Sequence, residues 1–399
     1  MKKNVKRITV YGCPFHTEKE IAAIMKRMDV DPAGIAIMTR KSDYMLIHLK
    51  NLDVKAANIL KQELLAIGGD LAISKKASMF RVKHTDAIAM ATVNQYTRLV
   101  KKLAIEPFNL RDTGKKINMV IENAHNQKNI KIFNKTDSKI KIMGVLNVTP
   151  DSFYDGGKYI VKERAIDHAM DMIKNGADII DVGGESSRPG SKSISVNEEI
   201  ERVIPVIKKI DKKNTLISID TTKPEVADAS LNNGADIIND INGFRSERMV
   251  KIASKWKCGA VIMHMQGTPQ TMQKNPAYDD VITDIYNFFE TQISVLEKNN
   301  IDNIIIDPGI GFGKTVEHNI DILKNLSSFK SLGYPIAIGV SRKSFIGEIT
   351  KREVDERLYG TLAAEAIAIM NGATILRVHD ISQTVDLIRV IESITNTQQ

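Results

Sequence analysis

Cysteine is scarce in this chain of 399 residues, which has only Cys13 and Cys258. The two lie far apart and lack metal-ligand spacing, so the sequence predicts neither a disulfide framework nor a zinc site. No apolar run reaches the length of about 18 residues that a membrane-spanning helix needs. The first residues are basic but lack the apolar segment and cleavage site of a secretory signal. We therefore expect a cytoplasmic protein with reduced thiols.

Aromatic residues are also few, at 5% of the chain. The charged residues, for their part, are distributed unevenly along it. Residues 1–138 hold 25 Lys and Arg against 13 Asp and Glu, a net +12, whereas the remainder holds 31 against 35, a net −4. A basic surface of this kind suits an acidic partner such as nucleic acid. No tight basic cluster with interleaved aromatics stands out, so we expect an ordinary lysine-rich surface and no nucleic-acid partner.

From Lys139 onward the chain repeats a short apolar run, a polar turn and an amphipathic stretch. The runs are rich in β-branched residues, as is typical of parallel strands that are buried on both faces. They are residues 140–148, 177–184, 215–220, 235–240, 259–265, 303–308, 335–341 and 373–380. Eight such units in this length predict a (β/α)8 TIM barrel over 139–399. The Gly-rich turn of a dinucleotide-binding sheet is missing after the first run.

Residues 1–138 have a different pattern, which predicts a small α+β domain of unknown role. We expect strands at 7–12, 44–49, 71–74 and 80–84, and helices at 18–28, 54–68 and 85–106. The polar segment 122–139 is the expected connector to the barrel. We find no catalytic constellation in this part of the chain. The fold class is therefore α/β, with a barrel preceded by the small domain.

Polar residues stand at the carboxyl ends of all eight runs, where barrel enzymes build their active sites. These residues are Asn147, Asp181, Glu185, Asp220, Asn239, Asp240, Met263 with His264, Asp307, Ser341 to Lys343, and Arg377 with His379 and Asp380. A single Asp at a strand end can simply cap the next helix. A complete ring of such groups indicates a polar ligand, because an unpartnered buried charge is costly. Carboxylates and amides suit the edges of a flat nitrogenous ring, and the Arg and His near the closure of the barrel suit phosphate.

Seven motifs extend this interpretation to a family. They are GVLNVTPDSFYDGG (144–157), DVGGESSRPGS (181–191), SIDTTKPEVA (218–227), DIINDINGF (236–244), DPGIGFGKTVEHN (307–319), GVSRKSFIG (339–347) and RVHD (377–380). In kind, order and spacing this set resembles the dihydropteroate synthases, over about two thirds of the chain. The resemblance implies a transferase that condenses a dihydropterin pyrophosphate with p-aminobenzoate and releases pyrophosphate. Residues 1–138 resemble, more weakly, the N-terminal extension of longer members.

The resemblance also implies a role for particular residues. The pterin would be bound by Asp220, Asn239, Met263, Asp307, Phe312, Lys343 and Arg377. The pyrophosphate would be bound by Asn147, Arg377 and His379, with Asn147 also a ligand of Mg²⁺. The p-aminobenzoate would be bound by Phe153, Arg188, Pro189 and Ser344. The residues expected to act in catalysis are Asp155, Asp220, Lys343, Arg377 and His379.

The expected mechanism is SN1-like, with pyrophosphate leaving before the aryl amine attacks and with loops 149–157 and 185–193 closing over the site. The family suggests a homodimer through outer helices, and inhibition by sulphonamides as mimics of p-aminobenzoate. Two alternatives remain open, a methyltetrahydrofolate methyltransferase and a non-catalytic pterin-binding paralogue. We also place Lys314 on the helix that follows Asp307, and expect it to matter much less than Lys343.

Overall fold

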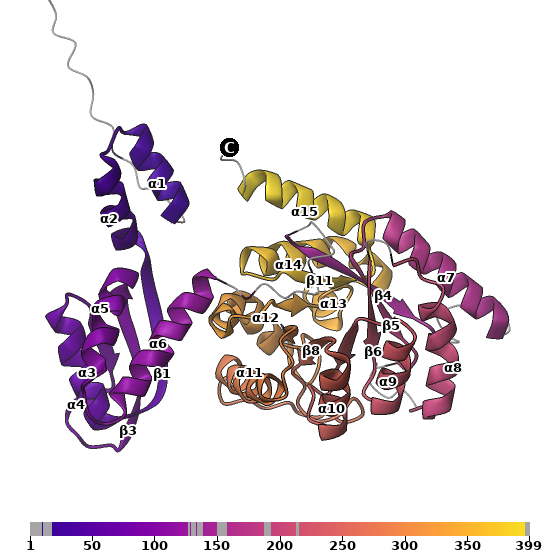
Figure 1. The fold of residues 1–399 in the computed structure, drawn as a ribbon, viewed down its shortest axis with the longest axis horizontal. Coiled ribbons are helices and arrows are strands. Elements are labelled where there is room, and N and C mark those ends of the chain that lie inside the picture. Colours follow the sequence, from indigo (N-terminus) through magenta and orange to yellow (C-terminus); the bar gives the residue numbers. More distant parts are fainter. Residues whose placement is uncertain are drawn as a thin grey trace, which may run out of the picture. The chain divides into compact units, whose positions relative to one another are not determined.

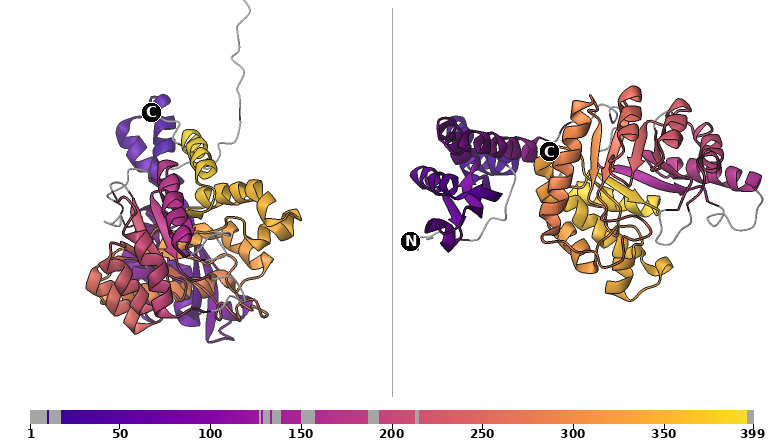
Figure 2. Two further views of the ribbon diagram at one scale, coloured as in Figure 1. Left: turned by 90° about the vertical axis from the view of Figure 1, so that its right-hand side faces the viewer. Right: turned by 90° about the horizontal axis from the view of Figure 1, so that it is seen from below.

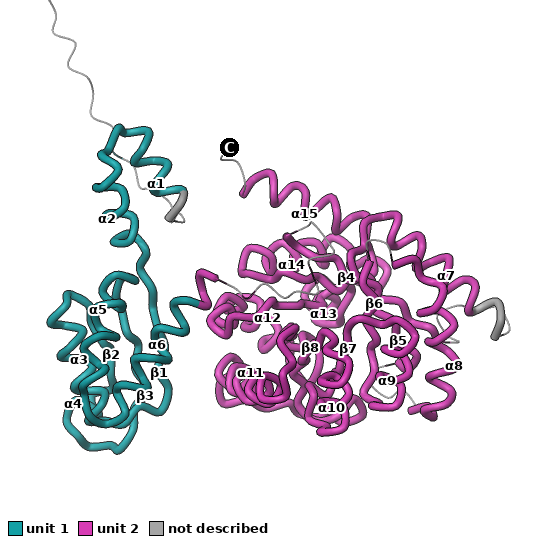
Figure 3. The backbone as a smooth tube through the Cα atoms, viewed as in Figure 1, with its two compact units in different colours: residues 1–122, 398 teal, residues 123–397, 399 magenta. Residues whose placement is uncertain are grey.

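The computed structural model describes residues 10, 18–126, 128, 133, 139–149, 158–186, 193–212 and 215–395. The chain divides into two compact units, one up to Glu122 and one from Asn123 onward (Figure 3). The division falls inside a helix, near the start of the connector expected at 122–139.

The N-terminal unit is a three-stranded antiparallel sheet with helices. Its elements are α1 (Glu18–Arg27), α2 (Pro32–Ser42), β1 (Tyr44–Asp53), α3 (Val54–Ala66), β2 (Asp70–Ile73), α4 (Lys75–Ser78), β3 (His84–Thr92), α5 (Val93–Leu103) and α6 (Leu110–His125). The strand order is β1-β3-β2, with β3 in the centre. The small α+β region is thus confirmed. The strand expected at 7–12 lies almost wholly outside the described residues.

The helix predicted for residues 85–106 is wrong in its first third. Residues His84–Thr92 form the central strand β3, and only Val93–Leu103 are helical. Alanine at alternate positions 87, 89 and 91 is buried against the rest of the unit, which is the two-residue period of a strand. The helical preference of alanine hid this period. The change of structure occurs at Thr92, which forms a capping box with Gln95.

The second unit alternates strands and helices. Its strands are β4 (Lys141–Asn147), β5 (Ile179–Gly183), β6 (Leu216–Asp220), β7 (Ile237–Asp240), β8 (Gly259–Met263), β9 (Ile304–Asp307), β10 (Ala337–Ile338) and β11 (Ile375–Val378). Its helices are α7 (Lys158–Lys174), α8 (Val196–Ile207), α9 (Pro224–Asn232), α10 (Glu247–Trp256), α11 (Val281–Lys298), α12 (Val316–Lys324), α13 (Ser344–Thr350), α14 (Leu358–Met370) and α15 (Ile381–Thr395). Two short 3-10 helices, η3 (Leu326–Leu332) and η4 (Val354–Glu356), complete it.

The eight strands form one parallel sheet in the order β10-β11-β4-β5-β6-β7-β8-β9. A bridge between Ile306 and Ile336 joins its two edges, so the sheet closes into a barrel. The helices surround the strands (Figures 1 and 2). The predicted TIM barrel is confirmed. No helix in the described ranges is both long and apolar enough to span a membrane.

One buried apolar residue from each strand fills the inside of the barrel near the strand starts. This layer consists of Met143, Ile179, Leu216, Ile237, Val261, Ile305, Ala337 and Ile375. Phe133, from the segment before β4, packs against it. Since side chains alternate along a strand, the next inward positions are two and four residues further on. The polar residues at the carboxyl ends of the strands occupy positions of this kind, so the apolar layer lies directly beneath the site.

The helix-to-strand connections place these strand ends consistently. Gly176 and Gly234 end α7 and α9 with φ values of 104° and 109°, a conformation that favours glycine. The chain then turns at once into β5 and β7. The same short sequence, NGAD, occurs at both places and contains the glycine that forms the turn.

Candidate active site

The inward positions beyond the apolar layer surround one pocket at the carboxyl ends of the strands. It is lined by Asp220, Asn239, Ile241, Met263, Asp307, Phe312, Gly339, Lys343 and Arg377. All seven residues that the resemblance assigns to the pterin are in this set. Their roles stay predictions, but the fold brings them together from six separate strands or the loops that follow them.

Arg377 is the centre of the polar network in this pocket. Its Nε donates to Asp181 Oδ2 at 2.7 Å, and its Nη2 donates to Asp220 Oδ2 at 2.8 Å. Burial disfavours the charged guanidinium, yet the two carboxylates outweigh this and raise the pKa of Arg377. Burial, together with the charge of Asp181, raises the pKa of Asp220 to about 7, although Arg377 opposes the shift. The pocket therefore holds a fixed cation beside a carboxyl group that titrates near neutrality.

Asp181 anchors this network from beneath, although it was predicted only as a polar residue at a strand end. It is fully buried on β5, and its Oδ2 also accepts a hydrogen bond from Asn239 Nδ2 at 3.0 Å. Its Oδ1 is buried and has no hydrogen-bond partner among the residues that the structure describes. The inward period of β5, from Ile179 to Asp181, was the signal that could have identified it. Asp181 thus orients both Arg377 and Asn239.

Lys343 and Phe312 form the opposite side of the pocket. The Nζ of Lys343 lies 4.6 Å from the centre of the Phe312 ring and donates to the carbonyl of Ile310. Burial lowers the pKa of Lys343 to about 8, although Asp307 opposes this shift. Burial likewise raises the pKa of Asp307, whose Oδ1 accepts a hydrogen bond from Gly309 N at 2.7 Å. A planar ring placed here meets an aromatic face, a buried amine and a carboxyl group.

Lys314 lies inside the protein, which corrects its predicted position on a helix. It precedes α12 by two residues and is 4% exposed. Its Nζ is 3.1 Å from His264 Nδ1 and donates to the carbonyls of His264 and Phe312. Burial lowers the pKa of Lys314 to about 7, and burial with nearby Lys314 and Arg245 lowers that of His264 to about 2. The loop after β9 instead folds back over this amine, and Gly309 lies against it.

The predicted phosphate-binding residues lie on the adjoining strands β4 and β11. Asn147 ends β4 opposite Gly183 of β5, and Gly183 leaves space between the side chains of Asn147 and Asp220. His379 follows β11, and its Nδ1 lies 3.0 Å from Ser341 Oγ. β11 pairs with β4, so these groups share one side of the barrel mouth with Arg377.

Other strand-end residues have structural partners instead. Asp240 accepts hydrogen bonds from Asn242 N and Phe244 N, both at 2.9 Å, and so caps its own turn. Lys223 forms ion pairs with Glu185 and buried Glu199. These residues satisfy the simpler interpretation of a polar strand end, and none of them lines the pocket.

Four predicted residues, Phe153, Asp155, Arg188 and Pro189, lie outside the described residues, as does most of both predicted loops. Ser344 is the first residue of α13, directly after Lys343. The described part of the chain contains no cluster of three His, Cys, Asp or Glu side chains that could hold a metal ion. One amide oxygen, from Asn147, fits the way Mg²⁺ binds, with few protein ligands together with substrate phosphates and water.

A polar pocket at the carboxyl ends of a closed eight-stranded barrel is the arrangement of a barrel enzyme's active site. Comparison with known families agrees with this class of protein. The family model described as "Pterin binding enzyme" matches residues 143–379. The Escherichia coli (strain K12) dihydropteroate synthase is 45% identical over 261 residues, which cover 65% of this chain and 93% of the relative. A solved Xanthomonas albilineans dihydropteroate synthase in complex with 7,8-dihydropteroate aligns with a TM-score of 0.59 at 38% identity. That alignment covers 64% of this chain and 94% of the other.

A further relative extends over both units. The bifunctional dihydropteroate synthase/dihydropteroate reductase of Helicobacter pylori (strain ATCC 700392 / 26695) is 34% identical over 364 residues. The alignment covers 90% of this chain and 93% of the relative. The chain belongs to the dihydropteroate synthase family, and its N-terminal unit has a counterpart in a longer member.

Proposed function

We propose that this protein condenses a dihydropterin pyrophosphate with p-aminobenzoate to form dihydropteroate and pyrophosphate. The observation that carries the proposal is the pocket itself. Arg377 is fixed between Asp181 and Asp220, and all seven predicted pterin residues surround one space. Membership of the family supports the reaction, and the pocket would supply the groups that the reaction needs.

The pterin would enter the pocket with its polar edges toward Asp220, Asn239 and Asp307. Carboxylates accept paired N–H groups from the amino-pyrimidine edge, as they do from Arg. The ring faces would contact Met263 and Phe312, both of which lie at the pocket wall. Lys343, between Phe312 and Asp307, would donate to a carbonyl or ring nitrogen.

The pyrophosphate would lie at the rim, toward Asn147, Arg377 and His379. Mg²⁺, when bound through Asn147 and phosphate oxygens, supplies positive charge that stabilises the leaving group. Arg377 keeps a permanent charge there because Asp181 and Asp220 hold it ionised. This cation favours breaking of the C–O bond before attack, which is the SN1-like order.

The second substrate, p-aminobenzoate, would approach from the side of α13, where Ser344 follows Lys343. Its aniline nitrogen is already neutral at pH 7, so no strong base is needed. The carbocation that develops on the pterin would be stabilised by nearby carboxylates such as Asp220. The remaining predicted contacts, Phe153, Asp155, Arg188 and Pro189, belong to this proposal on the resemblance alone.

Omitting one component at a time tests the proposed reaction. Purified protein should release pyrophosphate only when dihydropterin pyrophosphate, p-aminobenzoate and Mg²⁺ are all present. A sulphonamide should compete with p-aminobenzoate. Pterin binding by calorimetry without any release would contradict the proposal and favour a non-catalytic pterin-binding protein or a methyltransferase.

We also propose that the protein forms a homodimer through the outer face of α14. Tyr359, Ala363, Ile367 and Met370 follow one helical face, and the three large ones are 82%, 52% and 66% exposed. An apolar row of this kind suits a second copy of the same surface. Light scattering should give twice the chain mass, and Ile367→Glu should give the monomer. A monomeric wild type would contradict this proposal.

The Helicobacter relative favours a second candidate activity, reduction of dihydropteroate, because its name includes a reductase and its alignment covers both units. The step would move a hydride from a reduced nicotinamide or flavin, with a proton from water, onto the remaining C=N bond of the dihydropterin ring. Incubation of the protein with dihydropteroate and each donor should then yield the tetrahydro form. No oxidation of either donor would remove this candidate and leave the synthase unaffected.

A further inference from the structure

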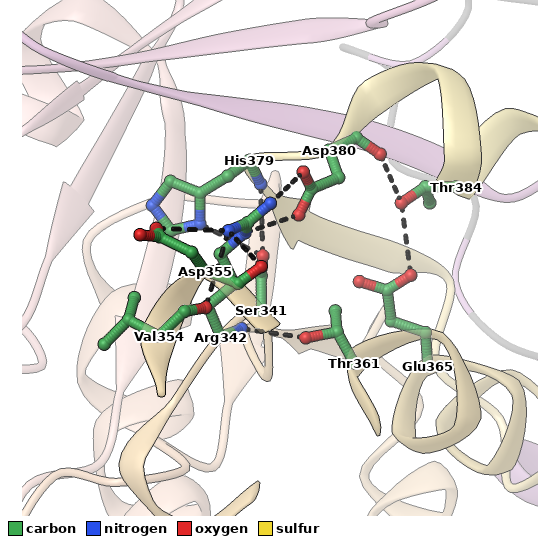
Figure 4. Close-up of polar contacts among 9 residues, drawn as sticks. All are labelled: Ser341, Arg342, Val354, Asp355, Thr361, Glu365, His379, Asp380 and Thr384. Atoms are coloured by element: carbon green, nitrogen blue, oxygen red, sulfur yellow. Dashed lines mark hydrogen bonds and ion pairs between the residues drawn. The ribbon is translucent and has the colours of Figure 1, made fainter. Parts of the chain in front are cut away.

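The ends of β10 and β11 are joined by a polar network that the synthase reaction does not itself require. Figure 4 shows its members, which come from the β10–α13 connection, η4, α14, the end of β11 and α15. In this network, Ser341 Oγ contacts the predicted phosphate ligand His379. It therefore bears on how His379 is presented to substrate.

Within the described residues, the side-chain oxygen of Ser341 has two hydrogen-bond contacts, both with His379. Its Oγ accepts from the backbone N–H of His379 at 3.3 Å and lies 3.0 Å from Nδ1 of the same residue. Ser341 is buried, at 6% exposed. A buried hydroxyl is satisfied only if it also donates its proton, and among the described residues His379 Nδ1 is the acceptor in contact with it. The Ser341 hydroxyl thus donates to Nδ1, and the neutral ring carries its proton on Nε2.

Arg342 fixes Ser341 in this position. It has a φ of 55°, in the left-handed region that non-glycine residues rarely adopt. Its Nε and Nη2 donate to the two carboxylate oxygens of Asp380 at 2.9 and 2.7 Å, and its backbone N–H donates to buried Thr361 Oγ1 at 2.9 Å. Paired bonds of this geometry are directional. Because Asp380 follows His379 directly, the fork ties both ends of the Ser341–His379 contact together.

A second layer supports Asp380 from behind. Thr384 Oγ1 lies 2.9 Å from the Asp380 carbonyl and 3.1 Å from Glu365 Oε2. Burial raises the pKa of Glu365 to about 8, so at pH 7 its carboxyl is mostly protonated. Thr384 therefore ties the carbonyl of Asp380 to Glu365, so α14 and α15 together hold the turn that carries His379 and Asp380.

We propose that Ser341, held by the Arg342–Asp380 fork, is a positioning residue that fixes His379 as the Nε2–H tautomer for donation to the pyrophosphate of the substrate. This inference rests on the proposed function of His379 in the synthase. It adds what that role leaves open, namely which ring nitrogen carries the proton and which residue decides it. Ser341 acts through His379 and does not itself need to touch the substrate.

The test measures the tautomer directly, by ¹⁵N NMR of the full-length protein labelled in its histidines. At about pH 8.5 the free imidazole is neutral, and its protonated and unprotonated nitrogens have well separated shifts. His379→Gln identifies the signals of His379. Wild type should show Nε2–H, Ser341→Ala should show a mixture of tautomers, and Ser341→Thr should keep Nε2–H. Ser254→Ala, which removes the hydrogen bond from Ser254 to the Asn299 carbonyl, is the matched control and should leave the signals unchanged.

Binding of two probes separates positioning from general damage. Ser341→Ala should weaken inorganic pyrophosphate, with Mg²⁺ present, by about 5- to 10-fold, since roughly one hydrogen bond to a charged group is lost. It should leave a dihydropterin without the pyrophosphate group within about 2-fold. Three results would overturn the inference. They are a wild-type His379 with its proton on Nδ1, an unchanged tautomer in Ser341→Ala, and equal weakening of both probes. If Ser341→Ala does not fold, the wild-type tautomer and Ser341→Thr still decide.

Failure of the proposed function gives a different result. In that case His379→Gln would leave pyrophosphate binding unchanged, or wild type would release no pyrophosphate with all substrates present, whatever tautomer the spectra show. The Nε2–H tautomer would then have no role in pyrophosphate binding, and the inference would be wrong together with the proposed function.

Discussion

The two units of this chain bury very different side chains. In the N-terminal unit, the only buried polar side chains of the described residues are Thr39 and Thr85, and each donates to a backbone carbonyl nearby. The barrel unit buries Asp181, Glu199, Asp240, Asp307, Lys314 and Glu365. Burial of a charge is unfavourable unless it is paired, so a fold keeps such groups where they serve a ligand or hold those that do. The contrast locates the chemistry in the barrel.

The largest expected effect comes from removing the central cation of that buried network. Arg377→Ala leaves Asp181 and Asp220 without their partner, so we expect a loss of about 3–5 kcal/mol in the free energy of unfolding. The rate constant kcat/KM should fall by about 1,000-fold or more, because the pyrophosphate also loses its fixed charge. Urea unfolding and pyrophosphate release measure the two effects.

Arg98→Ala, an exposed arginine of the N-terminal unit, is the control for this variant. It should change stability by less than about 0.5 kcal/mol and leave turnover alone. Equal effects of the two variants would contradict the claim that the chemistry lies in the barrel unit.

Within the barrel, half-buried Lys343 and buried Lys314 sharpen the distinction between a residue that contacts substrate and one that supports the site. Lys343→Ala should lower kcat/KM by about 100-fold with little change in stability, since Lys343 faces the pocket. Lys314→Ala should lower it by about 10-fold and cost about 1–3 kcal/mol of stability, because three buried acceptors lose their donor. Steady-state kinetics and thermal unfolding of both variants measure this. A larger kinetic effect for Lys314 would reverse the assignment.

The buried carboxyl of Glu365 predicts a stability that depends on pH. Its folded-state pKa is about 8, against 4.5 for an exposed glutamate. Below about pH 4.5 both states hold the proton, whereas between about 4.5 and 8 only the unfolded chain releases it, so stability falls as pH rises through this window. Glu365→Gln should remove this loss and gain about 2–4 kcal/mol at pH 8, with little gain at pH 4.5. Denaturant unfolding of the wild type and the variant at both pH values measures this. Equal gains at the two pH values would contradict the prediction.

Asp220 predicts a smaller effect, on ligand binding. Since its pKa is raised to about 7, the carboxylate forms as pH increases through neutrality. Dihydropterin affinity should therefore rise by about 10-fold from pH 6 to pH 8, because only the carboxylate accepts both N–H groups of the ring edge. Calorimetry on Asp220→Asn should give weaker and pH-independent binding. A wild-type affinity that falls with pH would contradict the assigned contact.

The fold and most of the pocket could be predicted from the sequence. The apolar runs gave the eight strands, and their carboxyl ends gave the residues that line the pocket. Asp181 and Lys314 were missed as supports because their importance comes from burial and from partners far away in the sequence. Residues 85–92 were assigned to a helix because three alternate alanines have a helical preference, although their burial in the sheet decides the structure.

Ser341 shows another limit of prediction. The motif SRKSF placed it at a strand end, but its contact with His379 depends on the left-handed turn at Arg342. No sequence period marks that turn, since Arg is not a residue that favours it. The contact becomes visible only when β10 and β11 lie side by side.

The claim that the chemistry lies in the barrel unit, and not in the N-terminal unit, is tested most directly by measuring turnover of the barrel unit alone. A chain of residues 123–399 keeps Phe133 beneath the apolar layer and Lys128 paired with Glu297, and it should fold by itself. We predict that its kcat/KM for pyrophosphate release lies within about 2-fold of the full chain, with Arg377→Ala inactive in both forms. A folded barrel that binds pterin yet releases no pyrophosphate would contradict the account, and would place part of the chemistry in residues 1–122.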